Sequence, residues 1–304
     1  MQLPKQVTLK EVGPRDGLQN ERVHMETADK VQLVNLLSET GLNYIEVTSF
    51  VHPKWIPQLA DAVEVLQAIK REKNCTYAAL IPNMHGLERA LQVNIDEASV
   101  FLSASESHNL KNINKKIDAT FPVLKEVVLE AKSAGKQVRG YISTVIGCPY
   151  EGYIQPEKVV RVVDQLLEMD IAEISLGDTI GVGVPTQVER LLEHLFKRYP
   201  AEKFAMHFHD TRGIALANIM KSMELGVTKF DSALGGLGGC PYAKGASGNV
   251  ATEDLLYLLD GMGIHTGVDM NALLKAATFV EQILGKPVSS KQMTIVRNEG
   301  GGQA

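Results

Sequence analysis

The chain has 304 residues, of which 44% are hydrophobic and 22% charged, and its formal net charge is -5. This balance is typical of a globular protein and argues against both a nucleic-acid-binding surface and a membrane span. The opening residues show no apolar core of a secretory signal. Three cysteines without metal-type spacing favour free thiols in a reducing cytoplasm.

Eight short runs rich in apolar and β-branched residues predict strands, with helical patterns between them. The predicted strands cover residues 7–13, 44–50, 76–82, 98–104, 138–145, 172–178, 204–210 and 229–236. Such an alternation predicts an α/β fold, a (β/α)₈ TIM barrel. An open doubly wound sheet is the competing architecture, but the first turn, GPRDG, lacks the phosphate-binding fingerprint of such sheets.

The remaining C-terminal residues are too few for a second domain. We therefore predict one domain over residues 1–304, with the barrel itself in residues 7–240. A cysteine-containing lid loop and two helices that cap the barrel are expected within residues 236–288. The polar, glycine-rich end, RNEGGGQA, predicts a flexible tail over residues 289–304.

The segment AMHFHD places His207 and His209 at alternate positions of a predicted strand, so both side chains point to the same face. They are either core histidines bonded to the backbone or ligands of one cation. Asp16 and Asn249 are predicted on the same rim of the barrel, which favours a metal site. Two imidazoles with carboxylate and amide oxygens, and no thiolate, suit Mg²⁺ or Mn²⁺ better than structural zinc.

The turn GPRDG presents Arg15 and Asp16 directly after the first strand. A solvated charge pair is the simpler interpretation of such a turn. Glu46, however, lies in YIEVTSF, a strand covered on both faces, where an unpaired carboxylate would be costly. We therefore predict an Arg15–Glu46 ion pair that fixes the guanidinium.

Two loops each allow a functional and a purely structural interpretation. GGLGGCPYAKGASGN is rich in glycine and predicts a mobile lid with a reactive thiol at Cys240, although an incidental turn cysteine is the alternative. Asn249 at its end could instead cap the next helix. The run HNLKNINKK, residues 108–116, either receives the phosphates of a nucleotide-tailed substrate or is a solvated loop.

These motifs together resemble the 3-hydroxy-3-methylglutaryl-CoA lyase family, within a wider group of metal-dependent barrel lyases and synthases. The resemblance covers most of the chain and rests on GPRDGLQNE, YIEVTSF, GCPYEG, EISLGDTIGVG, HFHD and above all GGLGGCPYAKGASGN. It implies cleavage of 3-hydroxy-3-methylglutaryl-CoA to acetoacetate and acetyl-CoA, a carbon–carbon lyase reaction. It also implies a divalent cation, a cytoplasmic location and a role in leucine degradation, and it allows a homodimer.

The resemblance also implies roles for individual residues. The implied metal ligands are Asp16, His207, His209 and Asn249. Arg15 would meet the thioester, Glu46 would support Arg15, and Cys240 would be the thiol on the closing loop. The residues implied to line or brace the substrate pocket are Gln19, Ser49, Ser175 and Asp178, with Asn112 at the CoA moiety.

Two parts of the chemistry stay open at this point. The base that takes the hydroxyl proton is Asp16 or His207, and the acid that protonates carbon is Cys240 or His207. A condensing synthase of the isopropylmalate or homocitrate type, or a lyase acting on a similar 3-hydroxyacyl-CoA, is the alternative enzyme. The synthases have an RDGEQ-like first motif, no cysteine lid and a further domain. A third alternative is a barrel that binds metal or CoA esters without turnover.

Overall fold

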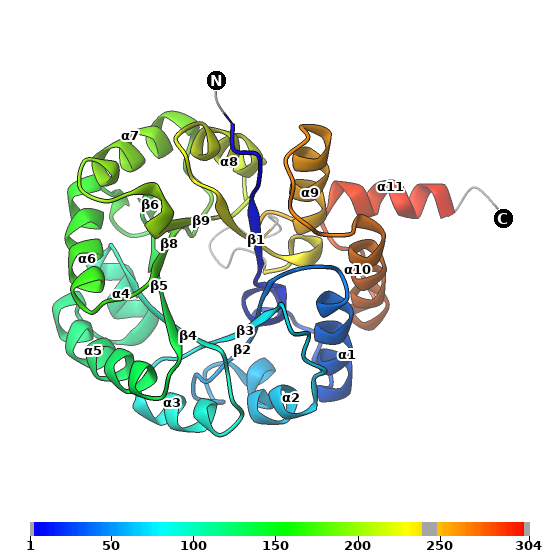
Figure 1. Ribbon diagram of the computed structural model, residues 1–304, viewed down its shortest axis with the longest axis horizontal. Coiled ribbons are helices and arrows are strands. Elements are labelled where there is room, and N and C mark those ends of the chain that lie inside the picture. Colours follow the sequence, from blue (N-terminus) through cyan, green and yellow to red (C-terminus); the bar gives the residue numbers. More distant parts are fainter. Residues whose placement is uncertain (1–2, 239–247, 301–304) are drawn as a thin grey trace.

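The computed structural model describes residues 3–238 and 248–300, and within these ranges eight parallel strands close into a barrel (Figure 1). Each predicted strand is present. The barrel strands are β1 (Thr8–Glu11), β2 (Tyr44–Ser49), β3 (Thr76–Leu80), β4 (Glu97–Ser103), β5 (Gln137–Ser143), β8 (Glu173–Asp178), β9 (Phe204–Phe208) and β10 (Lys229–Ser232). Their order around the barrel is β1-β10-β9-β8-β5-β4-β3-β2, and β1 closes it by pairing with both β10 and β2.

Helices surround the barrel, as expected for this fold (Figure 1). They are α1 (Thr27–Ser38), α2 (Ala62–Ala68), α3 (Met84–Leu91), α4 (Glu106–Ile113), α5 (Ile117–Ser133), α6 (Pro156–Glu168), α7 (Pro185–Phe196), α8 (Ala215–Glu224), α9 (Thr252–Gly261), α10 (Met270–Leu284) and α11 (Lys291–Gly300). Short elements are the π-helix η1 (Gly13–Gly17) and the 3₁₀-helices η2 (Pro57–Leu59), η3 (Ala201–Lys203) and η4 (Leu234–Gly236). A small hairpin pairs β6 (Gly147–Cys148) with β7 (Gly152–Tyr153).

The barrel strands are almost entirely buried because both of their faces are covered. Every residue of β2, β8 and β9 is buried, including Glu46 and His207. A polar group in such a strand needs a partner, so the inward-facing polar residues of the barrel bind one another. The functional side chains come from these strands and from the segments that follow them.

The two helices predicted as a cap, α9 and α10, lie in the outer layer, where α10 packs against α1 and α9 packs against α10 (Figure 1). Helix α11 was not predicted, and it covers Lys291–Gly300 of the tail expected to be flexible. The Asp254 carboxylate accepts hydrogen bonds from the backbone N–H groups of Lys291 and Gln292, both at 2.9 Å, and Met293 is buried. This helix start is capped by a distant residue, which local sequence patterns do not reveal.

The run 108–116 is also not the solvated loop considered above, because α4 covers most of it. Ser105 caps this helix by accepting a hydrogen bond from the N–H of His108 at 3.1 Å. The polar composition of this run had suggested a loop, although it contains most of a short helix. Among the described residues, no helix is both long and apolar enough to cross a membrane.

Candidate metal-assisted active site

The turn after β1 is a π-helix, η1, that presents Arg15 and Asp16 side by side. The backbone N–H groups of Arg15, Asp16 and Gly17 all donate to the carbonyl of Val12, at 3.1, 2.7 and 3.3 Å. A Cβ on Gly17 would come within 2.7 Å of the Cβ of Leu237. The turn is therefore packed too tightly for a side chain at this glycine.

The predicted Arg15–Glu46 ion pair is present. Arg15 Nε donates to Glu46 Oε2 at 2.5 Å, and the Tyr141 hydroxyl donates to the same oxygen at 3.1 Å. Arg15 Nη1 also donates to Asp16 Oδ1 at 2.5 Å. Burial alone would lower the pKa of Arg15, but the charges of Glu46 and Asp16 outweigh it and raise that pKa, so the guanidinium stays charged. The result is a fixed cation at the mouth of the barrel.

His207 and His209 point to the same side of the sheet, as their alternation predicts, and their ring centroids lie 5.4 Å apart. The Nε2 atoms of both rings lie 3.9 Å from Asp16 Oδ2. One ligand atom from each of the three residues lies within 4.8 Å of the others. Atoms bound to one small cation at about 2.1 Å lie roughly 3–4 Å apart, so this cluster needs only a small contraction to hold an ion.

Asn249 joins this cluster from a distant part of the chain. It forms an isolated bridge with His209, and its Nδ2 donates to Asp16 Oδ2 at 2.8 Å. Its Oδ1 is buried and accepts no hydrogen bond from the described residues. Helix α9 begins at Thr252 with Ala251 as its N-cap, so the alternative that Asn249 caps this helix is wrong.

The electrostatics of the cluster suit a cation. Burial would raise the pKa of Asp16, but Arg15, the two histidines and the hydrogen bond from Asn249 outweigh it and lower this pKa to about 2. Burial and the neighbouring His207 lower the pKa of His209 to about 4. Asp16 is therefore ionised and His209 neutral near pH 7, the states in which both groups bind metals. The donor set and the unused amide oxygen of Asn249 fit a divalent cation.

A cavity of about 570 Å³ opens beside this cluster. This volume lies in the range of small-molecule sites. The polar groups at its inner end include Arg15, Asp16, His207 and His209, while apolar residues such as Leu80 and Phe101 line its walls. These residues belong to different strands or follow them, so the cavity occupies the carboxyl-terminal face of the barrel, where barrel enzymes carry out chemistry.

Two of the predicted pocket residues line this cavity. Gln19 does so, and its Nε2 also donates to Asp16 Oδ1 at 3.0 Å. Asn112 on α4 also lines it, as does Lys115. Of the three lysines in the run 108–116, Lys111 instead stacks on the Tyr150 ring, with Nζ 4.3 Å from the ring centroid.

The other three predicted pocket residues lie in the protein interior and are not among the cavity-lining residues. Ser175 is fully buried and donates to Asp231 Oδ2 at 2.7 Å. Asp178 is fully buried and accepts from the backbone N–H of Gly183 at 2.8 Å. Ser49 Oγ accepts from the N–H of Val51 at 3.2 Å. Lining or bracing the pocket was expected of these three residues, and their positions favour bracing.

Cys240 lies outside the described residues, as does most of the predicted lid loop. The other two cysteines are buried free thiols, as expected for structural residues. Burial raises the pKa of Cys75 to about 12, so this thiol stays protonated. Cys148 Sγ lies 2.9 Å from Ser105 Oγ.

Sequence reasoning missed an inner layer of polar side chains beneath the site. Arg139 is fully buried in β5, and its Nη1 donates to the Tyr141 hydroxyl at 2.6 Å. Its Nη2 donates to Asp231 Oδ1 at 2.6 Å. The argument that singled out Glu46, a charge within a doubly covered strand, applies equally to Arg139 and Asp231 and could have found them.

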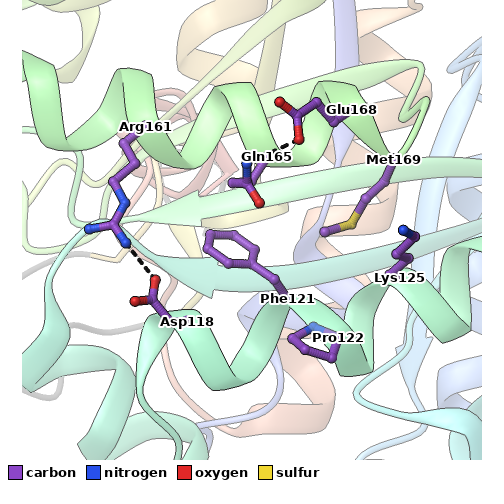
Figure 2. A pocket seen from close by; sticks show the side chains of 8 residues that line it. All are labelled: Asp118, Phe121, Pro122, Lys125, Arg161, Gln165, Glu168 and Met169. Atoms are coloured by element: carbon purple, nitrogen blue, oxygen red, sulfur yellow. Dashed lines mark hydrogen bonds and ion pairs between the residues drawn. The ribbon is translucent and has the colours of Figure 1, made fainter.

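A second cavity, of about 560 Å³, lies on the outside of the barrel between α5 and α6 (Figure 2). Three of its charged side chains are already engaged, since Arg161 Nη2 donates to Asp118 Oδ1 at 2.6 Å and Gln165 Nε2 donates to Glu168 Oε2 at 3.1 Å. Histidine and cysteine are absent from its eight lining residues. It shares no residue with the cavity at the barrel mouth.

The geometry is that of a barrel enzyme with a carboxylate–histidine cluster that could hold a metal ion. Comparison with known proteins agrees with the barrel fold. A family model described as HMGL-like matches residues 6–280. The chain therefore belongs to the HMGL-like family.

Similar proteins within this family are lyases. The chain is 55% identical over 298 residues to the hydroxymethylglutaryl-CoA lyase YngG of Bacillus subtilis (strain 168), covering 98% of this chain and 100% of that protein. It is 52% identical over 291 residues to a 3-hydroxy-3-isohexenylglutaryl-CoA/hydroxy-methylglutaryl-CoA lyase of Pseudomonas aeruginosa. This match covers 96% of this chain and 97% of that protein.

Solved structures show the same architecture. The crystal structure of the Bacillus subtilis HMG-CoA lyase has a TM-score of 0.97 at 55% identity and covers 98% of this chain and 100% of that chain. An HMG-CoA lyase of Acinetobacter baumannii in complex with coenzyme A and 3-methylmalate has a TM-score of 0.90 at 41% identity, covering 94% of each chain. Both agree with the predicted TIM barrel.

Proposed function

We propose that the protein cleaves 3-hydroxy-3-methylglutaryl-CoA to acetoacetate and acetyl-CoA with the help of Mg²⁺ or Mn²⁺. The observation that carries this proposal is the convergence of Asp16, His207 and His209 beside the fixed guanidinium of Arg15. Its similarity to hydroxymethylglutaryl-CoA lyases over most of its length supports the substrate. The lyase structure with coenzyme A supports a CoA thioester as the ligand.

Asp16, His207, His209 and Asn249 would hold the cation. When bound, the cation would lower the pKa of the substrate's tertiary hydroxyl. Its carboxylate and imidazole ligands, without a thiolate, favour Mg²⁺ or Mn²⁺. The buried, unused Oδ1 of Asn249 supports its inclusion among the ligands.

The reaction breaks the bond between C2 and C3 of the substrate. A base, Asp16 or His207, takes the proton of the C3 hydroxyl, and a C3 carbonyl forms as the electron pair of the C2–C3 bond passes to the thioester. Arg15 donates hydrogen bonds to the thioester oxygen as it gains enolate charge. A donor of this kind contributes roughly 3–4 kcal/mol in comparable sites.

The enolate carbon must then take up a proton, which Cys240 or His207 delivers. Glu46 would act through Arg15, because its carboxylate accepts from Arg15 Nε at 2.5 Å and so fixes the guanidinium. Gln19 lines the cavity at this point, and Asn112 would meet the CoA moiety farther out. Ser49, Ser175 and Asp178 would brace the site from within the protein.

A cytoplasmic location, a homodimer and a role in leucine degradation are further parts of this proposal. The two described cysteines are free thiols, in keeping with a reducing compartment. The oligomeric state is open to measurement by light scattering.

The test is an acetoacetate assay with 3-hydroxy-3-methylglutaryl-CoA, run with Mg²⁺, with Mn²⁺ and with a chelator. We expect acetoacetate only with metal. Condensation of acetyl-CoA with a 2-oxo acid, without acetoacetate formation, would instead indicate a synthase. Metal or CoA-ester binding with neither reaction would indicate a protein that binds these ligands without turnover. Cleavage of only longer 3-hydroxyacyl-CoA esters would indicate a lyase for a similar 3-hydroxyacyl-CoA.

A further inference from the structure

A buried carboxylate on β10, Asp231, lies behind one of the two histidines of the metal cluster. Asp231 is 1% exposed, and its two carboxylate oxygens contact different partners. Oδ1 accepts from Arg139 Nη2 at 2.6 Å. Oδ2 accepts from Ser175 Oγ at 2.7 Å and lies 3.2 Å from His207 Nδ1.

The charge state of Asp231 determines the direction of the last contact. Asp231 Oδ1 accepts from the charged guanidinium of Arg139, and Asp231 Oδ2 accepts from the Ser175 hydroxyl, which are the partners of an ionised carboxylate. An ionised carboxylate only accepts hydrogen bonds. The contact therefore requires a proton on His207 Nδ1. In the neutral ring the lone pair is then on Nε2, the nitrogen that lies 3.9 Å from Asp16 Oδ2.

The ring of His207 is held on another side as well. The Tyr141 ring packs against it edge-on, with ring centroids 6.2 Å apart and an interplanar angle of 86°. The Tyr141 hydroxyl is in turn fixed by Arg139 and Glu46. The orientation of His207 thus depends on a buried network, in which Tyr141 also lines the cavity.

We infer that Asp231 is a positioning residue, which holds His207 in the tautomer and orientation that direct Nε2 to the cation site. Ser175 and Arg139 hold the Asp231 carboxylate in place for this task. The inference deepens the proposed function, because the site it prepares is the proposed metal site. Carboxylate partners of metal-binding histidines generally fix the ring and raise its basicity.

The competing explanation is that Asp231 only balances the charge of Arg139. Glu173 provides a matched control, because its Oε1 accepts from Arg139 Nε at 2.8 Å and its other ion pairs are with Lys10 and Lys229. The substitutions Asp231→Asn and Glu173→Gln each replace one carboxylate partner of Arg139 by an amide. Only the first alters the contact with His207.

The first measurement is ¹⁵N NMR of the histidine rings in the metal-free, wild-type protein in mildly alkaline buffer. The signals of His207 are assigned by their loss in His207→Gln. We expect the neutral ring to carry its proton on Nδ1, and a proton on Nε2 would overturn the inference. This result requires neither metal binding nor a folded Asp231 variant.

The second measurement is the affinity for Mn²⁺, followed by electron paramagnetic resonance. We expect Asp231→Asn to weaken it about 10- to 100-fold and to increase the Nε2-protonated form, while Glu173→Gln keeps the wild-type affinity. Equal affinities in Asp231→Asn and the wild type, or equal losses in both variants, would overturn the inference. A wild-type protein that binds no Mn²⁺ would refute the proposed metal site instead, and the tautomer of His207 would still be decided by NMR.

Discussion

Asn249 donates a hydrogen bond from Nδ2 to Asp16 Oδ2 at 2.8 Å, although 233 positions separate the two residues in the chain. This contact joins the turn after the first barrel strand to the segment that leads into α9. It places an amide oxygen with no other partner among the described residues beside the carboxylate–histidine cluster.

The first prediction concerns this amide. Asn249→Ala should weaken Mn²⁺ binding at least about 10-fold, because it removes one oxygen ligand. Asp269→Ala is the control, since Asp269 is a real N-cap, whose side chain accepts from the N–H of Ala272 at 2.8 Å. It should cost about 1 kcal/mol of stability and leave the metal affinity unchanged. Wild-type affinity in a titration of Asn249→Ala would remove this residue from the ligand set.

The second prediction concerns the guanidinium. Arg15→Lys keeps the positive charge but loses the forked donors that reach Glu46 and Asp16 and that, in the proposed function, would reach the thioester oxygen. We expect kcat for acetoacetate formation to fall about 100- to 1,000-fold, the usual cost of losing one donor to a developing oxyanion. Circular dichroism of the variant checks that it is folded. A kcat close to the wild-type value would exclude Arg15 from stabilising the enolate.

The third prediction concerns the cysteine outside the described residues. Cys240→Ser should reduce turnover at least about 100-fold, the scale of a lost acid–base group, without changing stability or metal affinity. Cys75→Ser is the control, because the Cys75 thiol is buried and has a raised pKa. That variant should keep wild-type turnover. Equal turnover in Cys240→Ser and the wild type would leave His207 as the proton donor.

The fourth prediction concerns the pH dependence of stability. Glu253 on α9 is fully buried, and its oxygens accept from the N–H of Gly235, both at 3.0 Å. Burial raises its pKa from 4.5 to about 8, and burial likewise raises that of Glu11 to about 7. The folded protein therefore keeps protons that the unfolded chain has lost above pH 4.5. Stability from these groups is complete at low pH and declines as pH rises through about 7 to 8.

Glu253→Gln should remove part of this decline. Each such group lowers the free energy of unfolding by up to about 1.4 kcal/mol per pH unit, so urea unfolding should show a flatter pH profile between the unfolded and folded pKa values. Glu193→Gln, which changes an exposed glutamate on α7, should keep the wild-type profile. An unchanged slope in Glu253→Gln would mean that Glu253 is ionised in the folded protein.

Much of the fold was encoded locally. Apolar runs alternating with helical patterns located all eight barrel strands, because burial on both faces of a parallel sheet requires continuous apolar segments. The same-face orientation of His207 and His209 followed from the two-residue period of a strand. The Arg15–Glu46 pair followed from the cost of an unpaired buried charge.

Tertiary structure alone decided the contacts between segments distant in the chain. Closure of the barrel and the register of its strands bring Asn249 to Asp16, and Asp231 behind His207. The same packing buries Ser175 and Asp178 beneath the cavity, and it places Asp254 at the start of α11. A local sequence pattern indicates which side chains must be buried or paired. The identity of each partner depends on how the whole barrel closes.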